Sequence, residues 1–352
     1  MITIRDVARA AGVSVATVSR VQNGSALVKE ATRQRVGEVV RRLGYAPHAA
    51  ARTLITSRTG TIGVLLPDLY GEFFSEVIRG IDQTAQRHGF HLLVSSSHDE
   101  AEAVRTALHS MRGRVDGLIV MWPELEELML PNLPAGFPVV LLSAPLGTSG
   151  FDVIRIANFE GAYGMVSHLL QRGHRRIGIL KGAEGNADAA ERLRGYRAAL
   201  LDVDIEPGPF ETAGAFTEES GFHAAWDLLH REVTPTAIFA ANDAMAIGAL
   251  SALRKAGLRV PDDVALVGFD DIPSARYMDP PLSTVRVDIS ALGERATTRL
   301  LAAVSDPDNH TPRIETLPTT VVLRGSSQPL SHPASQSTRP APFTVTSLMR
   351  HI

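Results

Sequence analysis

The chain has 352 residues, no cysteine, and 35 Lys and Arg against 38 Asp and Glu. The length is sufficient for more than one domain, and the lack of cysteine excludes disulfides and cysteine-bound metals. We find no signal peptide ahead of the first predicted helix and no apolar run long enough to cross a bilayer. The sequence therefore predicts a cytoplasmic protein with no membrane partner.

Charge is distributed unevenly along the chain. Residues 1–59 carry ten Lys and Arg and three Asp and Glu, whereas the remainder carries 25 and 35. A basic N-terminal part on an acidic body is typical of a protein whose N-terminal part meets phosphate groups. A solvated charged face is the alternative interpretation. The asymmetry favours nucleic acid as a partner.

Residues 3–24 are typical of two short helices joined by a tight turn. Thr3 stands three residues before Asp6, which is the spacing of a capping box at a helix start. Gly12 allows the backbone angles that end the first helix, and Ser14 can cap the second. A third helix is predicted over Glu30–Leu43 by its apolar stripe. The pattern predicts a small helix-turn-helix domain.

The second of these helices has a face suited to reading DNA. Val15, Ala16, Ser19 and Arg20 fall on this face, and Val18 falls on the opposite side. Small residues with one Arg can lie against base edges in a major groove, where Arg reads guanine bidentately. Two amphipathic helices around a Gly turn also occur in other proteins, so the spacing alone leaves the function open.

From residue 60 to residue 328, short β-rich apolar runs alternate with helical patterns. Such alternation predicts an α/β fold with parallel sheets covered on both faces, here as two doubly wound lobes with a cleft at the carboxyl ends of the strands. We expect Asn242 and Asp288 to cap two of the helices. The predicted strands are Ile62–Leu66, Leu92–Ser95, Gly117–Met121, Val139–Leu142, Ile177–Leu180, Ala237–Ala240 and Val264–Phe269.

The N-terminal motif T-x-x-D-V-A-x-x-A-G-V-S-x-x-T-V-S-R-V-x-N-G resembles the signature of the lactose/galactose-repressor family of bacterial transcription regulators. The resemblance extends to about residue 328. It implies a helix-turn-helix DNA-binding domain over residues 1–46 and a hinge helix or linker over 47–58. Residues 59–328 would form a periplasmic-binding-protein-like domain for effector binding and dimerisation, with crossovers between lobes near residues 157, 286 and 318. The Pro- and Ser-rich tail 329–352 is expected to be disordered.

The segment YAPHAAARTL, residues 45–54, resembles the hinge motif of this family. The resemblance implies that Leu54 enters the minor groove as a wedge and kinks the duplex. The alternative is a linker whose Leu54 packs on the body, and His48 replaces the usual Asn. The residues expected to contact DNA are Thr3, Val15, Ala16, Thr17, Ser19, Arg20, Asn23, His48, Ala51 and Leu54.

Three polar residues match effector-contacting positions of the family, namely Arg192, Asn242 and Asp270. A guanidinium, an amide and a carboxylate can together donate to and accept from neighbouring hydroxyls, which suits a sugar. Each also has a structural interpretation: a surface ion pair for Arg192, a helix cap for Asn242 and bonds to loop amides for Asp270. Ala157 stands where many relatives carry a polar residue.

Three aromatic residues match positions where relatives place apolar groups against the effector: Phe73, Phe74 and Phe216. Aromatic faces stack on the C–H face of a sugar or on a purine, so they do not choose between these two ligands. Core packing is the alternative for either member of the adjacent pair.

Enzyme motifs are not found. The sequence has no dinucleotide-binding G-x-G-x-x-G after a strand, no P-loop and no His pattern with metal-ligand spacing, so we expect neither catalysis nor a cofactor. The favoured function is a homodimeric repressor that binds a palindromic operator under control of a small-molecule effector, for which we predict a carbohydrate. The alternatives are a sugar-binding protein without a transcriptional role and a sugar-modifying enzyme.

Overall fold

The computed structural model describes residues 2–22, 27–45, 58–98, 100–121, 133–134, 136–145, 148 and 150–327. The predictions for Asn23, for the hinge residues His48, Ala51 and Leu54, and for the tail 329–352 lie outside these described residues.

The N-terminal domain, which we call the head, contains the helices α1 (Ile4–Ala11), α2 (Val15–Gln22) and α3 (Glu30–Leu43). Thr3 caps the start of α1, because its backbone N and its Oγ1 donate to the Asp6 carboxylate at 3.0 and 2.7 Å. The hydrogen bond from the Thr3 hydroxyl lowers the pKa of Asp6. The three helices enclose a small core of their own, with a fully buried valine from each: Val7, Val18 and Val36.

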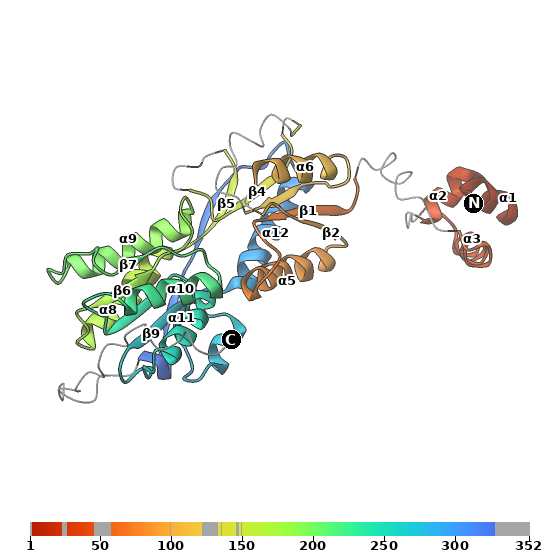
Figure 1. The fold of residues 1–352 in the computed structure, drawn as a ribbon. Coiled ribbons are helices and arrows are strands. Elements are labelled where there is room, and N and C mark those ends of the chain that lie inside the picture. The colour runs from red at the N-terminus through yellow and green to blue at the C-terminus, as the bar shows by residue number, and fades with distance from the viewer. Residues whose placement is uncertain are drawn as a thin grey trace.

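The rest of the described chain forms two lobes, each built on a six-stranded sheet (Figure 1). In lobe 1 the strand order is β11-β5-β4-β3-β1-β2, and all neighbours are parallel. Its strands are β1 (Thr61–Leu66), β2 (His91–Ser96), β3 (Leu118–Val120), β4 (Val139–Leu142), β5 (Asp152–Ile156) and β11 (Ile314–Leu317), and its helices are α5 (Glu72–Arg87), α6 (Ala101–Met111) and α12 (Ile289–Ser305).

In lobe 2 the strand order is β12-β10-β9-β8-β6-β7, and only β12 runs antiparallel to its neighbour. Its strands are β6 (Ile177–Leu180), β7 (Glu211–Thr212), β8 (Ala237–Ala240), β9 (Ala265–Asp270), β10 (Ser283–Arg286) and β12 (Thr320–Val322). Its helices are α8 (Asn158–Gln171), α9 (Ala187–Leu201), α10 (Glu218–Leu229) and α11 (Asp243–Lys255), with short 3-10 helices η2 (Pro273–Tyr277) and η3 (Gly325–Ser327).

The chain passes between the lobes three times, after β5, after β10 and between β11 and β12. Thr319 donates to the carbonyl of Ala157 at 3.3 Å, so the first and third crossings touch. The predicted α/β class with two doubly wound lobes is therefore confirmed.

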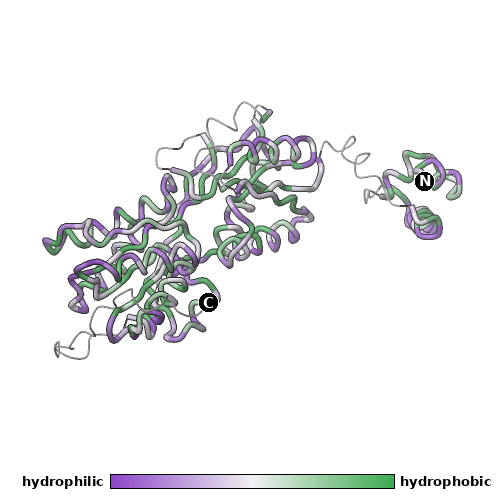
Figure 2. The backbone as a smooth tube through the Cα atoms, viewed as in Figure 1, coloured by the Kyte–Doolittle hydropathy of each residue, from purple (hydrophilic) through white to green (hydrophobic). Residues whose placement is uncertain are grey.

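Successive side chains of the lobe 1 strands point to opposite faces of the sheet and pack into two different core clusters. Ile62 and Val64 pack toward one cluster with helix α5, whereas Leu65 belongs to a second cluster with helix α6. Along the core helices the colour alternates between hydrophilic and hydrophobic, as expected for helices that lay one face on a sheet (Figure 2). In the part of the chain that the structure describes, no helix combines the length and apolar character needed to cross a bilayer.

Helices α10 and α11 are in tight backbone contact at two glycines. A Cβ atom at Gly248 would overlap the carbonyl of Glu218, and one at Gly221 would overlap the backbone of Met245. By contrast, a Cβ at Gly164 of α8 would meet Val321 Cγ2 at an ordinary 3.4 Å.

We predict that Gly248→Ala lowers the free energy of unfolding by about 1–3 kcal/mol, because the two helices must separate. Gly164→Ala, also in a helix, should change it by less than about 1 kcal/mol, since alanine favours the helical backbone. Urea unfolding of both variants checks this. Equal stabilities would show that the helix pair can relax freely.

Candidate effector cleft and DNA-reading helix

Arg192 of α9 is the centre of a buried polar cluster at the carboxyl ends of the lobe 2 strands. Its side chain is 4% exposed. Its Nε donates to Asn158 Oδ1 at 2.8 Å, its Nη1 donates to the carbonyl of Ala241 at 2.5 Å, and its Nη2 lies 3.2 Å from Asp270 Oδ1. The guanidinium also lies 3.8 Å from the centre of the Phe269 ring, a cation–π contact. Arg192 thus forms a buried ion pair rather than a surface one.

Asp270 is held in an uncommon backbone conformation. Asp270 and Asp271 have φ values of 108° and 57°, and Asp271 is fixed by Arg286 Nε at 2.7 Å and Arg324 Nη2 at 2.6 Å. The backbone N of Ile272 donates to the buried Asp243 at 2.9 Å. These contacts compensate for the strain of the turn and aim Asp270 at Arg192.

Asn242 and Phe216 form one unit on the neighbouring loops. Asn242 Oδ1 accepts from the backbone N of Met245 at 2.9 Å, so it caps α11, and its Nδ2 donates to the carbonyl of Phe216 at 3.0 Å. The Phe216 residue has φ 63°, and its ring packs on Gly182 and lies 5.8 Å from the Arg192 guanidinium. The structure therefore joins Arg192, Phe216, Asn242 and Asp270 in one place.

Two polar residues of this cluster were not predicted from the sequence. Asn158, the first residue of α8, accepts from Arg192 and donates from Nδ2 to Asp188 Oδ1 at 2.7 Å. Asp188 is half-buried, whereas Arg192, Asp270 and Asn158 are almost fully buried. Asp188 is therefore the most accessible of the charged groups around Arg192. It stands four residues before Arg192 in the first turn of α9, a spacing that places both on one helix face.

Burial dominates the ionisation of the acidic groups. It raises the pKa of Asp270 to about 7, although Arg192 opposes the shift. Burial also raises the pKa of Asp188, again against the attraction of Arg192, and it raises that of Asp243 well above its usual range together with the negative charge of Asp270. The carboxyl groups of Asp270 and Asp188 are therefore both attracted to the one buried guanidinium of Arg192.

Phe73 and Phe74 lie on the lobe 1 side, in the first turn of α5 after the carboxyl end of β1. Both are half-buried, and their rings meet edge to face with centroids 5.6 Å apart. The preceding residue, Glu72, accepts from the backbone N of Ser274 in η2 at 2.9 Å, so the start of α5 touches lobe 2. Among the described residues, the rings within cation–π distance of Arg192 are those of Phe216 and Phe269, not those of Phe73 and Phe74.

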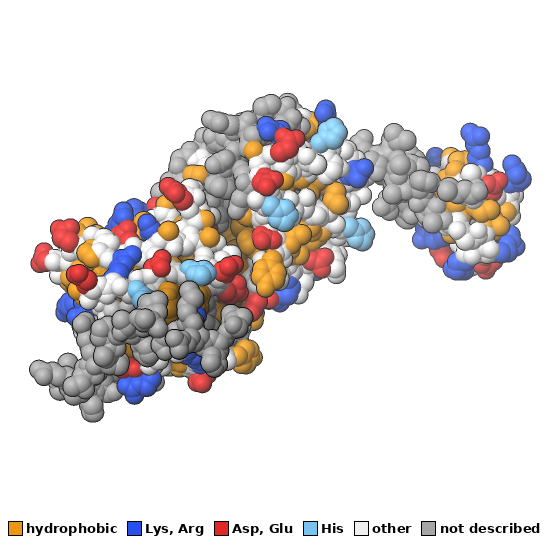
Figure 3. All heavy atoms as spheres, viewed as in Figure 1, with side chains coloured by type: hydrophobic (Ala, Val, Ile, Leu, Met, Phe, Trp, Pro, Cys, Tyr) orange, Lys and Arg blue, Asp and Glu red, His pale blue; other side chains and the backbone are white. Residues whose placement is uncertain are grey.

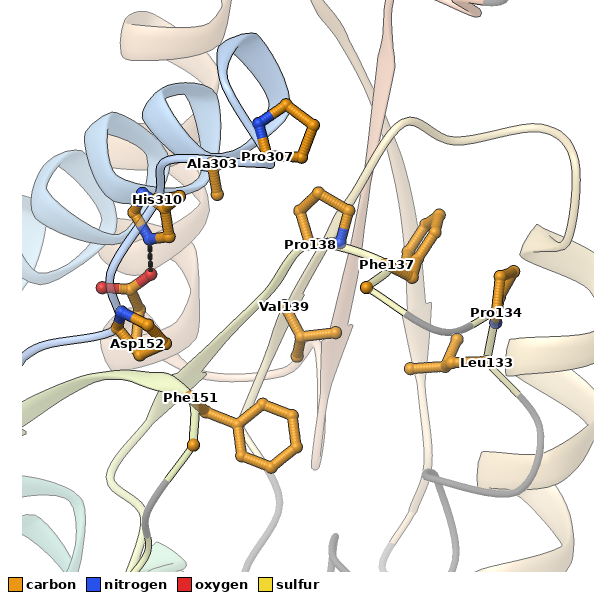
Figure 4. Close-up of a pocket in the computed structure, with 13 residues that line it drawn as sticks. Leu133, Pro134, Phe137, Pro138, Val139, Phe151, Asp152, Ala303, Pro307 and His310 are labelled. Carbon is orange, nitrogen blue, oxygen red and sulfur yellow. Dashed lines mark hydrogen bonds and ion pairs between the residues drawn. The ribbon is translucent and has the colours of Figure 1, made fainter.

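A separate cavity of about 350 Å³ lies at the other end of lobe 1, where β4 and β5 begin (Figure 4). Phe137, Val139 and Phe151 line it, and Asp152 bonds to His310 at its edge. It contains none of the predicted effector residues. Within the described part of the chain, no group of three or more acidic or His side chains is placed to hold a metal ion.

On the head, α2 presents the predicted reading face. Val15, Ala16 and Arg20 are exposed, whereas Ser19 and Thr17 are half-buried. The backbone N of Thr17 donates to Ser14 Oγ at 3.1 Å, which caps α2. Thr3 is exposed at the start of α1, and Lys and Arg side chains are spread over the visible face of the head (Figure 3).

Comparisons with known proteins match both parts of the chain. The model of bacterial regulatory proteins, lacI family, matches residues 3–48, and the periplasmic binding protein-like domain matches residues 166–327. The HTH-type transcriptional repressor PurR of Haemophilus influenzae (strain PittEE) is 35% identical over 311 residues, which cover 88% of this chain and 93% of that protein.

Solved structures agree with these matches. The lac repressor dimer bound to operator and the anti-inducer ONPF has a TM-score of 0.84 and 32% identity, over 93% of this chain and 99% of that chain. A complex of the transcriptional regulator CelR with cellobiose has a TM-score of 0.70 and 32% identity, over 93% and 100% of the two chains.

Fold, site and relatives together define a DNA-binding transcriptional repressor with a small-molecule effector site, not an enzyme. The chain belongs to the lacI family of bacterial regulatory proteins.

The buried carboxyl of Asp270 generates a prediction about pH. Its pKa of about 7 lies above the ordinary 3.8, so ionising it destabilises the native state progressively between about pH 4 and pH 7. Asp270→Asn cannot ionise. The free energy of unfolding of this variant, relative to wild type, should therefore rise across that window by about 2–4 kcal/mol and level off above it.

Urea unfolding at pH 5, 6, 7 and 8 measures this difference. Asp262→Asn, at a carboxylate that is 58% exposed and paired with Arg259 on the surface, is the control. If the difference in unfolding free energy between Asp270→Asn and wild type does not change with pH, the raised pKa of Asp270 is wrong.

Proposed function

We propose that this repressor binds a palindromic operator as a homodimer through its heads, and that a neutral carbohydrate in the cleft between the lobes controls this binding. The supporting observation is the cluster around Arg192, a buried polar site in a domain separate from the exposed reading face of α2. Residues 1–46 would read DNA, residues 47–58 would form the hinge, and residues 59–328 would bind effector and dimerise. The hinge roles of His48, Ala51 and Leu54 remain predictions.

The bonding state of the cluster favours a ligand that donates hydrogen bonds. Arg192 already donates to Asn158 and Ala241 and pairs with Asp270. Asp270 Oδ1 lies 3.2 Å from Arg192 Nη2 but accepts no hydrogen bond of good geometry among the described residues, and Asp188 is the least buried of the charged residues around Arg192. Sugar hydroxyls would donate to these carboxyl groups while the Phe216 ring stacks on the C–H face of the sugar.

A purine base is the alternative effector, since Phe73, Phe74 and Phe216 could stack on it equally well. The binding of cellobiose by CelR concerns that protein, but it shows that a relative of the same fold accepts a sugar. Thermal-shift screening with cellobiose, ribose, adenine and hypoxanthine separates the two classes, because a ligand that binds only the native state raises Tm.

The function itself is tested by titrating the protein with DNA. An operator is first selected by the wild-type protein from a random-sequence pool, and its affinity is then measured with and without the ligand found by thermal shift. We expect the selected operator to be palindromic and its affinity to change with ligand, in either direction. A selected sequence without two-fold symmetry, or an affinity that no ligand changes, would refute the proposal.

Arg20 is expected to read a base. Arg20→Ala should lower operator affinity about 10- to 100-fold, since a bidentate guanine contact contributes about 1–3 kcal/mol of discrimination, and should affect random DNA much less. The control is Arg9→Ala, which removes an exposed Arg of α1 that pairs with Asp6. It should lower the affinity for operator and for random DNA slightly and by the same factor. If Arg20→Ala lowers the affinity for operator and for random DNA by the same factor, Arg20 contacts only a phosphate group and reads no base.

Asp188 is expected to accept hydrogen bonds from the ligand. Asp188→Ala should weaken binding of the identified sugar about 10- to 100-fold, because buried ligand donors left unpaired cost about 1–3 kcal/mol, while ligand-free operator affinity stays at the wild-type level. Glu191→Ala removes a carboxylate from the same helix that instead pairs with Arg194 on the surface. Isothermal titration calorimetry that finds the two variants alike would exclude Asp188 from the site.

A further inference from the structure

The first residues of the core after the linker are held by a single carboxylate. Asp116 Oδ1 accepts from the backbone N of Thr59 at 2.6 Å and from its Oγ1 at 2.9 Å, and Asp116 Oδ2 accepts from the backbone N of Gly60 at 2.8 Å. Gly60 has φ 66°, a left-handed conformation that bends the chain around the carboxylate. Hydrogen bonds to an ionised acceptor are roughly twice as strong as neutral ones. We call these three bonds the Asp116 clamp.

The Asp116 clamp is attached to the inner strands β3 and β1 of the lobe 1 sheet. Asp116 stands two residues before β3, and its own backbone N donates to the carbonyl of Thr61 at 2.8 Å. Strand β3 pairs with β1, which lies between β3 and β2 in the sheet. The opposite end of β1 leads into the turn before Phe73 and Phe74. The clamp and the effector side of lobe 1 therefore lie at opposite ends of the same strands.

A second bond ties the same point to a helix that starts at the boundary between the lobes. Arg58 Nη2 donates to the carbonyl of Val304 near the end of α12 at 3.1 Å. Helix α12 begins at Ile289, directly after the chain has left lobe 2 through β10. Its first turn is packed against α5, since a Cβ at Gly80 would overlap the carbonyl of Ser290. The exit of the linker is thus bonded to two elements that both reach the region between the lobes.

We propose that Asp116 is a positioning residue for operator binding: the Asp116 clamp fixes the direction in which the linker leaves the core, so that two heads meet two half-sites at a fixed separation. This inference rests on the proposed function. Without the clamp, residues 58–60 sample more conformations, and binding a palindrome must order them again. A half-site engages one head and places no demand on the separation of two heads.

The test compares a full palindrome with a half-site. The palindrome is the operator selected by the wild-type protein, and the half-site is a duplex of the same length that keeps one arm. Asp116→Ala should lower palindrome affinity about tenfold and leave half-site affinity unchanged. Asp116→Asn, which keeps one acceptor oxygen, should fall between Asp116→Ala and wild type. Thermal melting monitors folding of each variant.

Asp263→Ala is the matched control. Asp263 also accepts from a backbone N–H and from a side chain, both of Arg259, but in a surface turn of lobe 2. It should leave both affinities unchanged.

Two results would overturn the clamp: equal losses on palindrome and half-site, which indicate general damage, or wild-type affinity of Asp116→Ala for the palindrome. A wild-type protein that binds palindrome and half-site alike would instead refute the homodimeric operator binding itself, and the clamp with it.

Discussion

The ligand-binding core depends on satisfying one buried guanidinium. A charged Arg side chain that is removed from water must find partners on every side, or the native state loses several kcal/mol. Arg192 finds them on separate segments: the amide of Asn158, the carbonyl of Ala241, and Asp270 at a left-handed turn. The positions of α8, the loop after β8 and the turn after β9 are therefore linked through this side chain, and any movement of one must be accommodated by the others.

The fold was largely accessible from the sequence because most strands are short apolar runs between helical patterns. Two of the strands that were not predicted, β10 and β11, lack this signal. Strand β11 has exposed Ile314 at its start, and β10 buries the polar residues Ser283 and Thr284, whose backbone N and hydroxyl donate to Ser326 and Asp243 respectively. Their burial is set by tertiary partners, which no local pattern contains.

The same distinction explains the site. Arg192 and Asp270 were found through motifs, and Asp188 could have been found from its i,i+4 spacing to Arg192 on α9. Asn158 could not, because it lies 34 residues from Arg192 on a different helix, α8, and meets Arg192 only through the packing of α8 against α9. The sequence suggested Asn242 equally as a ligand contact and as a helix cap, and the structure shows the cap directly.

The three crossings between the lobes have a consequence for synthesis on the ribosome. Neither lobe is a continuous stretch of sequence: lobe 1 needs α12 and β11, and lobe 2 needs β12, which is made after both. The head, whose core uses residues no later than Tyr45, can fold as soon as it emerges. A nascent chain would thus carry a finished reading head long before either lobe is closed, and a product truncated near residue 280 would leave both lobes with open sheet edges, which are prone to aggregation and degradation.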